Sequence, residues 1–165
     1  MTDKRMKKLA EVLVNYSVKV KPGDWVYINS SIVALPLLKE VYKQVLLAGG
    51  NPTTNIYQDD LNELFYKNAG DEQLEFVAPN LKLYYETADV MIHLRGAENT
   101  RALSGVDPKK QAKRAQATRG LTETYMARSA TKELRWVLTD YPCLAFAQEA
   151  CLLYTSDAAD EEDSV

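Results

Sequence analysis

Histidine and cysteine are scarce in this chain of 165 residues, which has one histidine, His93, and two cysteines. Histidine-based metal sites usually use two or more imidazoles, so His93 cannot build one alone. Two cysteines support no disulfide framework, and no charged-then-apolar leader opens the chain, so we expect a reducing, cytoplasmic setting. The apolar runs are far shorter than the roughly 18 to 20 residues of a membrane span, and we expect no membrane partner.

Glycine-based phosphate signatures are missing as well. The sequence contains neither G-x-G-x-x-G nor a glycine-rich loop that ends in Gly-Lys-Ser/Thr. Its composition is otherwise that of an ordinary globular protein, with 46% hydrophobic and 26% charged residues. A chain of this length buries roughly 70% of its unfolded surface in one core. We therefore expect one domain that folds without disulfides or metal.

Acidic charge is concentrated at the end of the chain, in CLLYTSDAADEEDSV (151–165), which has five acids and no basic residue. Without it, residues 1–150 carry 20 basic against 18 acidic side chains, a net charge of +2 instead of -3. Such a run is typical of a disordered tail, and its carboxylates lack the spacing of a calcium-binding loop. The stretch CLLYTSDAADE also resembles the conceptual translation of a transposase sequencing adapter. We therefore expect 151–165 to be an artefactual tail and 1–150 to be the domain.

Helical and extended patterns alternate along residues 1–150. Apolar residues at helical spacing predict a helix over 4–17, with Thr2 or Asp3 as its cap. Runs of β-branched and aromatic residues predict four strands, at 25–29, 53–57, 90–94 and 136–139. Strands separated by helices predict right-handed crossovers. The expected fold class is therefore α/β, a mostly parallel sheet with helices on its faces.

The remaining helices are predicted from their start and stop residues. Pro36 suits a first turn and Gly49-Gly50 a left-handed stop. Further helices are expected from Asp59 or Asp60, from Gly70-Asp71, over 81–87, over most of 97–130 with Asp107 as a cap, and from Pro142 to Ala150. The last of these runs directly into the acidic tail. A helix interrupted in its second turn predicts a truncated gene.

Three features could have a chemical role, and each has a plainer explanation. His93 falls near a strand end, where α/β proteins bind ligands, but no partner residues accompany it, which favours a structural or surface role. Asp59 and Asp60 could bind a hard cation, yet their position before Leu61 favours helix capping. Cys143 could be an activated thiolate, but an inert packing role is favoured. The sequence thus identifies no catalytic, cofactor-binding or metal-binding residue.

Five basic residues gather in one predicted helix: Lys109, Lys110, Lys113, Arg114 and Arg119. Lys110, Lys113 and Arg114 share one helical face. The second hypothesis is therefore a nucleic-acid or anion-binding α/β module that uses the basic helix from Lys109 to Arg119. The small net charge of 1–150 and the lack of any accompanying nucleic-acid motif disfavour it.

Four segments resemble the N-terminal half of the thermophilic-type metalloaminopeptidases, the M29 peptidase family. They are LAEVLVNYSVKVKPGDWVYI (9–28), ELFYKNAGDEQL (63–74), RGAENTRALSGVDP (95–108) and LTDYPCLAFAQEA (138–150). The third is the most specific, because amphipathic patterning alone does not produce a long mixture of small, charged and turn residues. The resemblance implies the N-terminal α/β domain of a two-domain, cytoplasmic, usually dimeric enzyme. It also implies that the complete enzyme removes N-terminal residues from peptides with two divalent ions of zinc, cobalt or manganese.

The resemblance also implies what this chain lacks. Members of the family are considerably longer, and their metal-binding Glu, His and Asp residues belong to a C-terminal domain. We therefore expect a fragment that carries no metal ions and is inactive by itself. Surfaces that meet the missing domain or a second subunit are expected to leave apolar side chains such as Leu144 and Phe146 exposed.

Overall fold

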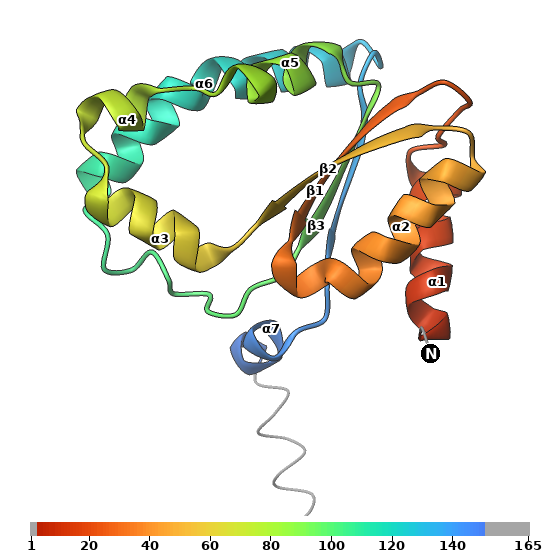
Figure 1. The fold of residues 1–165 in the computed structure, drawn as a ribbon, viewed down its shortest axis with the longest axis horizontal. Coiled ribbons are helices and arrows are strands. Elements are labelled where there is room, and N and C mark those ends of the chain that lie inside the picture. The colour runs from red at the N-terminus through yellow and green to blue at the C-terminus, as the bar shows by residue number, and fades with distance from the viewer. Residues whose placement is uncertain (1–2, 151–165) are drawn as a thin grey trace, which may run out of the picture.

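One parallel sheet forms the centre of the computed structural model, which describes residues 3–150 (Figure 1). Its four strands run in the order β2-β1-β3-β4. They are β1 (Trp25–Ser31), β2 (Asn51–Tyr57), β3 (Val90–Arg95) and β4 (Arg135–Asp140). The predicted α/β class is confirmed, and each predicted strand is present and slightly longer than expected. The predictions for Thr2 and for the tail 151–165 lie outside the described residues.

Two helical segments cover one face of the sheet. The first is α1 (Lys4–Glu11), which continues as the π-helical segment η1 (Val12–Ser17), and the second is α2 (Leu35–Leu47), which follows the short helix η2 (Ile32–Ala34). The predicted capping role of Asp3 is confirmed, because its side chain accepts a 2.9 Å hydrogen bond from the Arg5 backbone. Apolar side chains of these segments and of β1 and β3 form the main core: Ala10, Leu13, Val14, Val18, Val26, Ile28, Ala34, Leu37, Leu38, Val41, Val45, Val90, Ile92 and Leu94.

The turn after α2 depends on a glycine, as predicted. Gly49 has a φ of +81°, in the left-handed region that disfavours a side chain. A Cβ at this position would also lie 3.1 Å from Pro22. This close approach brings the end of α2 against the turn that precedes β1. Pro36 lies in the first turn of α2, also as predicted.

Four helices arch over the second face of the sheet (Figure 1). They are α3 (Asp59–Asn68), α4 (Asp71–Glu75), α5 (Pro79–Thr87) and α6 (Pro108–Ala130), and α6 packs along α4 and α5. A smaller core lies beneath α5, where the Tyr84 ring stacks on Tyr27 at 4.2 Å. No helix within residues 3–150 is long and apolar enough to cross a bilayer.

One local prediction is confirmed over most of its range, and another is wrong. The segment 97–130 is mainly helical, as predicted, because α6 occupies it from Pro108 onward, whereas residues 96–107 form a loop with turns. Asp107 does cap α6, accepting a 2.8 Å hydrogen bond from the Lys109 backbone, as predicted. The residue before α3 is Gln58, so Asp59 and Asp60 lie inside the first turn and do not cap the helix. There their negative charge still favours the helix, because the amino end of a helix is partly positive.

The last described helix, α7 (Leu144–Glu149), begins two residues after Pro142. Leu144 is 72% exposed, as predicted. Phe146 is only half-buried, so the expectation of exposure holds in part.

Candidate functional site

The carboxyl ends of the four strands meet at one edge of the sheet. From β1 the chain returns through α2 to β2 on one side, whereas β3 and β4 lie on the other side of β1. Ligands of parallel α/β sheets bind outside the carboxyl ends of the strands, at such a switch in strand order. Two cavities lie at this edge, between the loop 96–107, the beginning of α3 and α7.

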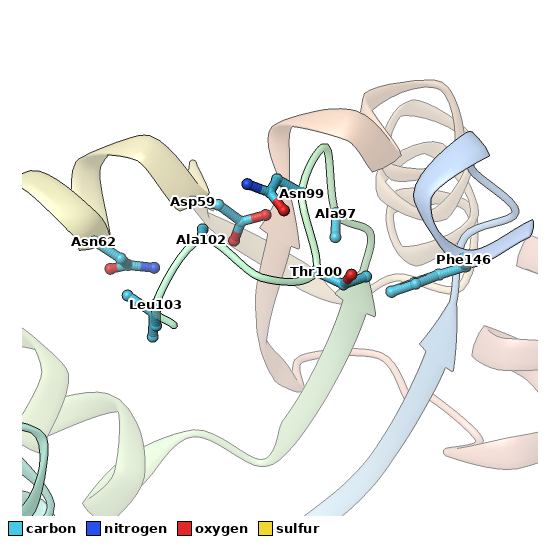
Figure 2. Close-up of a pocket in the computed structure, with 8 residues that line it drawn as sticks. All are labelled: Asp59, Asn62, Ala97, Asn99, Thr100, Ala102, Leu103 and Phe146. Carbon is cyan, nitrogen blue, oxygen red and sulfur yellow. The ribbon is translucent and has the colours of Figure 1, made fainter. Parts of the chain in front are cut away.

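The first cavity has a volume of about 290 Å³ and a mixed lining (Figure 2). It is lined by Asp59, Asn62, Ala97, Asn99, Thr100, Ala102, Leu103 and Phe146. Burial raises the pKa of Asp59, the backbone of Glu98 opposes the rise by hydrogen bonding, and the nearby charge of Asp60 adds to it. Thr100 donates a 2.6 Å hydrogen bond to Glu149, which ties the loop to α7.

The second cavity is larger, about 680 Å³, and mostly apolar. It is lined by Val33, Ala97, Glu98, Tyr141, Pro142, Cys143, Leu144, Ala145 and Ala147. Cys143 is a free, half-buried thiol in this apolar wall, in agreement with its predicted packing role. Gly96 lets the loop pass close to η2, since a Cβ there would lie 3.2 Å from the Cβ of Val33.

An ion pair that sequence reasoning missed joins the ends of β3 and β4. Arg95 donates to both carboxylate oxygens of Asp140, with Nε–Oδ1 and Nη2–Oδ2 distances of 2.7 and 3.0 Å. Beside it, burial and the charge of Asp59 raise the pKa of Tyr57, while the charge of Arg95 lowers it. Arg95 opens the segment RGAENTRALSGVDP. The segment most specific to the resemblance thus forms the loop that lines the first cavity.

The basic side chains of α6 bind the chain's own helices. Lys110 Nζ donates to the carbonyl oxygens of Tyr66 and Ala69 at 2.9 Å, at the end of α3. Arg114 Nη1 donates in the same way to Leu74 and Phe76, at the end of α4, at 3.2 and 2.5 Å. Cations at these positions satisfy the unpaired carbonyls of a helix end and match its partial negative charge.

Two other cations of α6 also have partners. Lys113 forms 3.0 Å ion pairs with both Asp71 and Glu75 of α4, and Arg119 pairs with Glu123 at 2.8 Å. Lys110, Lys113 and Arg114 do share one helical face, as predicted, but that face points into the domain. The geometry therefore favours a structural role for this face and disfavours the nucleic-acid hypothesis.

His93 lies within β3, on the second face of the sheet. Its ring is half-buried and meets Tyr125 edge-on at 6.3 Å between centroids. Burial lowers the pKa of the imidazole, because an apolar setting disfavours its charged form. This placement agrees with the structural role that the sequence favours.

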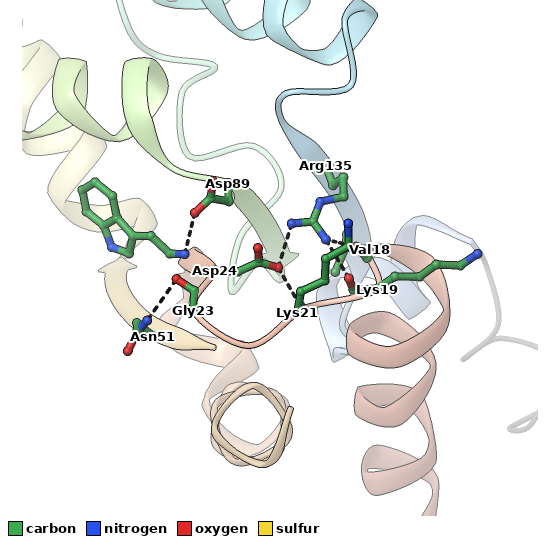
Figure 3. Close-up of polar contacts among 9 residues, drawn as sticks. Val18, Lys19, Lys21, Gly23, Asp24, Asn51, Asp89 and Arg135 are labelled. Atoms are coloured by element: carbon green, nitrogen blue, oxygen red, sulfur yellow. Dashed lines mark hydrogen bonds and ion pairs between the residues drawn. The ribbon is translucent and has the colours of Figure 1, made fainter. Parts of the chain in front are cut away.

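A polar network closes the opposite, amino-terminal edge of the sheet (Figure 3). The Trp25 backbone donates to Asp89 at 2.7 Å, and Asn51 Nδ2 donates to the Gly23 carbonyl at 3.2 Å. Asp24 accepts hydrogen bonds from the Lys21 backbone and from Arg135, at 2.6 and 2.7 Å. The Lys-Pro-Gly-Asp-Trp turn thus fastens the first strand to its neighbours and has a structural function.

The described residues do not fit a dinuclear metal site. Within 3–150, no three histidine, cysteine, aspartate or glutamate side chains come together as a group able to hold an ion. Several of the carboxylates also have cationic partners inside the domain, among them Asp24, Asp71 and Asp140. Two-metal hydrolysis needs several carboxylates and usually imidazoles around one point.

Comparison with known proteins identifies the family of this chain. The profile of the family described as thermophilic metalloprotease (M29) matches residues 2–162. The chain belongs to the M29 family. The predicted membership is thereby confirmed, and the match includes all four segments on which it was based. The M29 match also extends into the segment 151–165.

Two similar proteins are considerably longer than this chain. Aminopeptidase 2 of Geobacillus stearothermophilus is 25% identical over 167 residues, which cover 97% of this chain and 39% of the relative. The structure of wild-type AmpT from Thermus thermophilus superposes with a TM-score of 0.68 at 18% identity, over 85% of this chain and 36% of AmpT. The fold is therefore shared with AmpT, and the chain spans less than two fifths of either relative.

Proposed function

We propose that this M29 chain is the N-terminal part of a metal-dependent aminopeptidase that removes N-terminal residues from peptides, and that it is inactive by itself. The observation that carries the proposal is a contrast. The family match covers nearly the whole chain, yet that chain covers only 36 to 39% of its relatives and brings no metal-binding group together within 3–150. The name of Aminopeptidase 2 supports the choice of an exopeptidase.

In this proposal, the α/β domain and the metal ions belong to different parts of the complete enzyme, because the described residues form no metal-binding group. Residues 1–150 form the α/β domain, while two ions of zinc, cobalt or manganese are held by the part of the enzyme outside this chain. When bound there, such ions would supply Lewis-acid polarisation of the scissile carbonyl and activation of a water molecule. The complete enzyme acts on peptides, forms a homodimer and resides in the cytoplasm, where the low cysteine content is normal.

Residues 151–165 are proposed to be foreign to the gene, because of their resemblance to a translated adapter. Resequencing the source genome across the codons for Gln148, Glu149 and Ala150 tests this directly. We expect the reading frame to diverge from CLLYTSDAADE and to continue into a longer protein. A genomic read that continues into CLLYTSDAADE would contradict the proposed boundary.

Activity of the complete gene product tests the proposed function. We expect it to release N-terminal residues from short peptides, to lose this activity with a chelator, and to regain it with zinc, cobalt or manganese. The matched control is the 165-residue chain at the same concentration and metal content. A complete product that is folded and loaded with metal but releases no N-terminal residue would refute the assignment.

A further inference from the structure

The two outer edges of the sheet differ in chemistry. The outer edge of β2 carries Pro52, which has no backbone N–H, among the polar residues Asn51, Thr53, Thr54 and Asn55. Proline and polar side chains are common on edge strands that remain free, because they discourage pairing with another strand. The β2 edge therefore has the features of a permanent edge.

The outer edge of β4 has the opposite character. Its middle residues are Trp136, Val137 and Leu138, and Trp136 and Leu138 are 46% and 42% exposed. The two charged residues lie at the ends of the strand, where Arg135 is paired with Asp24 and Asp140 with Arg95. The centre of β4 thus has neither the proline nor the charge that protects a free edge, and no strand within residues 3–150 pairs with its outer side.

The topology indicates where additional chain would pair. The strand order is β2-β1-β3-β4. After β1, each later strand from β3 onward is added on the same side of the sheet, and β4 is the outermost strand on that side. Doubly wound sheets of the order 2-1-3-4-5 place their next strand beside the fourth. The relatives have more than 60% of their length outside the region that this chain covers.

We propose that, in the complete aminopeptidase, a further strand from the part of the protein outside this chain pairs with the outer edge of β4 and covers Trp136 and Leu138. This inference rests on the proposed function for the existence of that part. The strand is expected to place apolar side chains on the face of the sheet that carries α5 and α6, where Trp136 already meets Tyr125 at 5.5 Å between ring centroids.

Backbone hydrogen exchange tests the inference, measured on the complete gene product and on the 165-residue chain. We expect the outward amides of β4, those of Trp136 and Leu138, to exchange at least tenfold more slowly in the complete protein. The outward amides of β2 are expected to exchange similarly in both. Equal exchange of the β4 amides in the two proteins would overturn the inference.

A matched pair of variants gives a second measurement. Leu138→Lys and Ile56→Lys place the same charge on side chains of similar exposure, 42% and 49%, on the two edges. We expect Leu138→Lys to remove the β4 protection of the complete protein while leaving the short chain folded, and Ile56→Lys to change neither. Unchanged β4 protection in Leu138→Lys, or equal loss in both variants, would overturn the inference.

Two further outcomes separate this inference from the proposed function. A complete protein that protects β4 but shows no metal-dependent peptidase activity would refute the function and leave the added strand standing. A complete protein that is an active peptidase but whose outward β4 amides exchange freely would support the function and refute the added strand. If the short chain sediments as a dimer with protected β4 amides, a second copy takes the edge and the inference fails.

Discussion

Arg135 and Asp24, 111 positions apart in the chain, form an ion pair with a distance of 2.7 Å between Nη2 and Oδ2. Both side chains are largely buried, with exposed fractions of 25% and 12%. The same guanidinium donates to the carbonyl oxygens of Val18 and Lys19, at 3.2 and 2.6 Å. The contact therefore fastens the start of β4 to the turn between η1 and β1.

Replacing this arginine tests how much the contact stabilises the domain. Arg135→Leu leaves the Asp24 carboxylate without its cation in a mostly buried position, and such losses cost about 2 to 4 kcal/mol of unfolding free energy. Denaturant unfolding of the 165-residue chain measures the change. Arg119→Leu is the control, because its pair with Glu123 is exposed and worth less than about 1 kcal/mol. Equal effects of the two substitutions would show that the Asp24 pair contributes little.

The α6 cations are predicted to stabilise the arch of helices. Lys110→Met removes hydrogen bonds to three carbonyl oxygens at the end of α3 and is expected to lower the unfolding free energy by about 1 to 3 kcal/mol. Lys109→Met, one position away, is expected to stay within about 0.5 kcal/mol, as is usual for substitutions away from such contacts. A Lys110→Met variant as stable as wild type would remove the structural explanation of the basic face.

The nucleic-acid alternative has its own test. We expect fluorescence anisotropy to detect no specific binding of the 165-residue chain to nucleic acid. Binding with a log-log salt slope of about -0.9 per neutralised phosphate, abolished by Lys110→Ala, Lys113→Ala and Arg114→Ala together, would restore that hypothesis. Because these three substitutions also remove contacts within the domain, circular dichroism has to show that the triple variant is folded.

Two glycines form a matched pair for backbone effects. Gly49→Ala places a Cβ at a φ of +81° and 3.1 Å from Pro22, so it is expected to destabilise the domain by about 1 to 3 kcal/mol. Gly120→Ala meets nothing within 4 Å inside α6 and is expected to stabilise the chain by about 0.5 to 1 kcal/mol. Thermal unfolding distinguishes the two, and a stabilised Gly49→Ala variant would contradict the assigned turn geometry.

Burial of His93 predicts a pH dependence of stability. Its pKa in the folded chain is lowered from 6.5, so the unfolded chain binds more protons just below that value. The contribution of His93 to stability is therefore fully present above about pH 6.5 and falls as the pH decreases from there. His93→Asn should flatten the dependence of unfolding free energy on pH between about 5 and 7. An unchanged slope in His93→Asn would indicate that the histidine is not protected from protonation.

Local patterns were sufficient for much of the fold. The β-branched and aromatic runs at Trp25 and Val90, and the capping residues Asp3 and Asp107, reproduce strands and helix starts because those signals are carried by neighbouring residues. Residues 96–107 end at the predicted cap Asp107 and form a loop with turns. The hydrogen bond from Thr100 of this loop to Glu149 of α7 joins residues 49 positions apart, so no local pattern predicts it.

The site itself could not be predicted in the same way. The Arg95–Asp140 pair depends on the register of β3 against β4, and the carbonyl partners of Lys110 and Arg114 depend on the placement of α6 beside α3 and α4. The register of the strands and the placement of α6 both depend on residues that are far apart in the sequence, so local patterns do not predict them. The basic cluster was visible in the sequence, but its partners are backbone oxygens, which no side-chain pattern reveals.

Peptidase activity of the purified 165-residue chain tests the central claim most directly. The chain is incubated with zinc, cobalt or manganese and a short peptide with a free N-terminus, and released residues are followed by mass spectrometry. We predict no release above the buffer and metal control, with no change on adding a chelator. Chelator-sensitive release of the N-terminal residue, copurifying with the folded chain, would contradict the claim that this chain is the non-catalytic part of an M29 aminopeptidase.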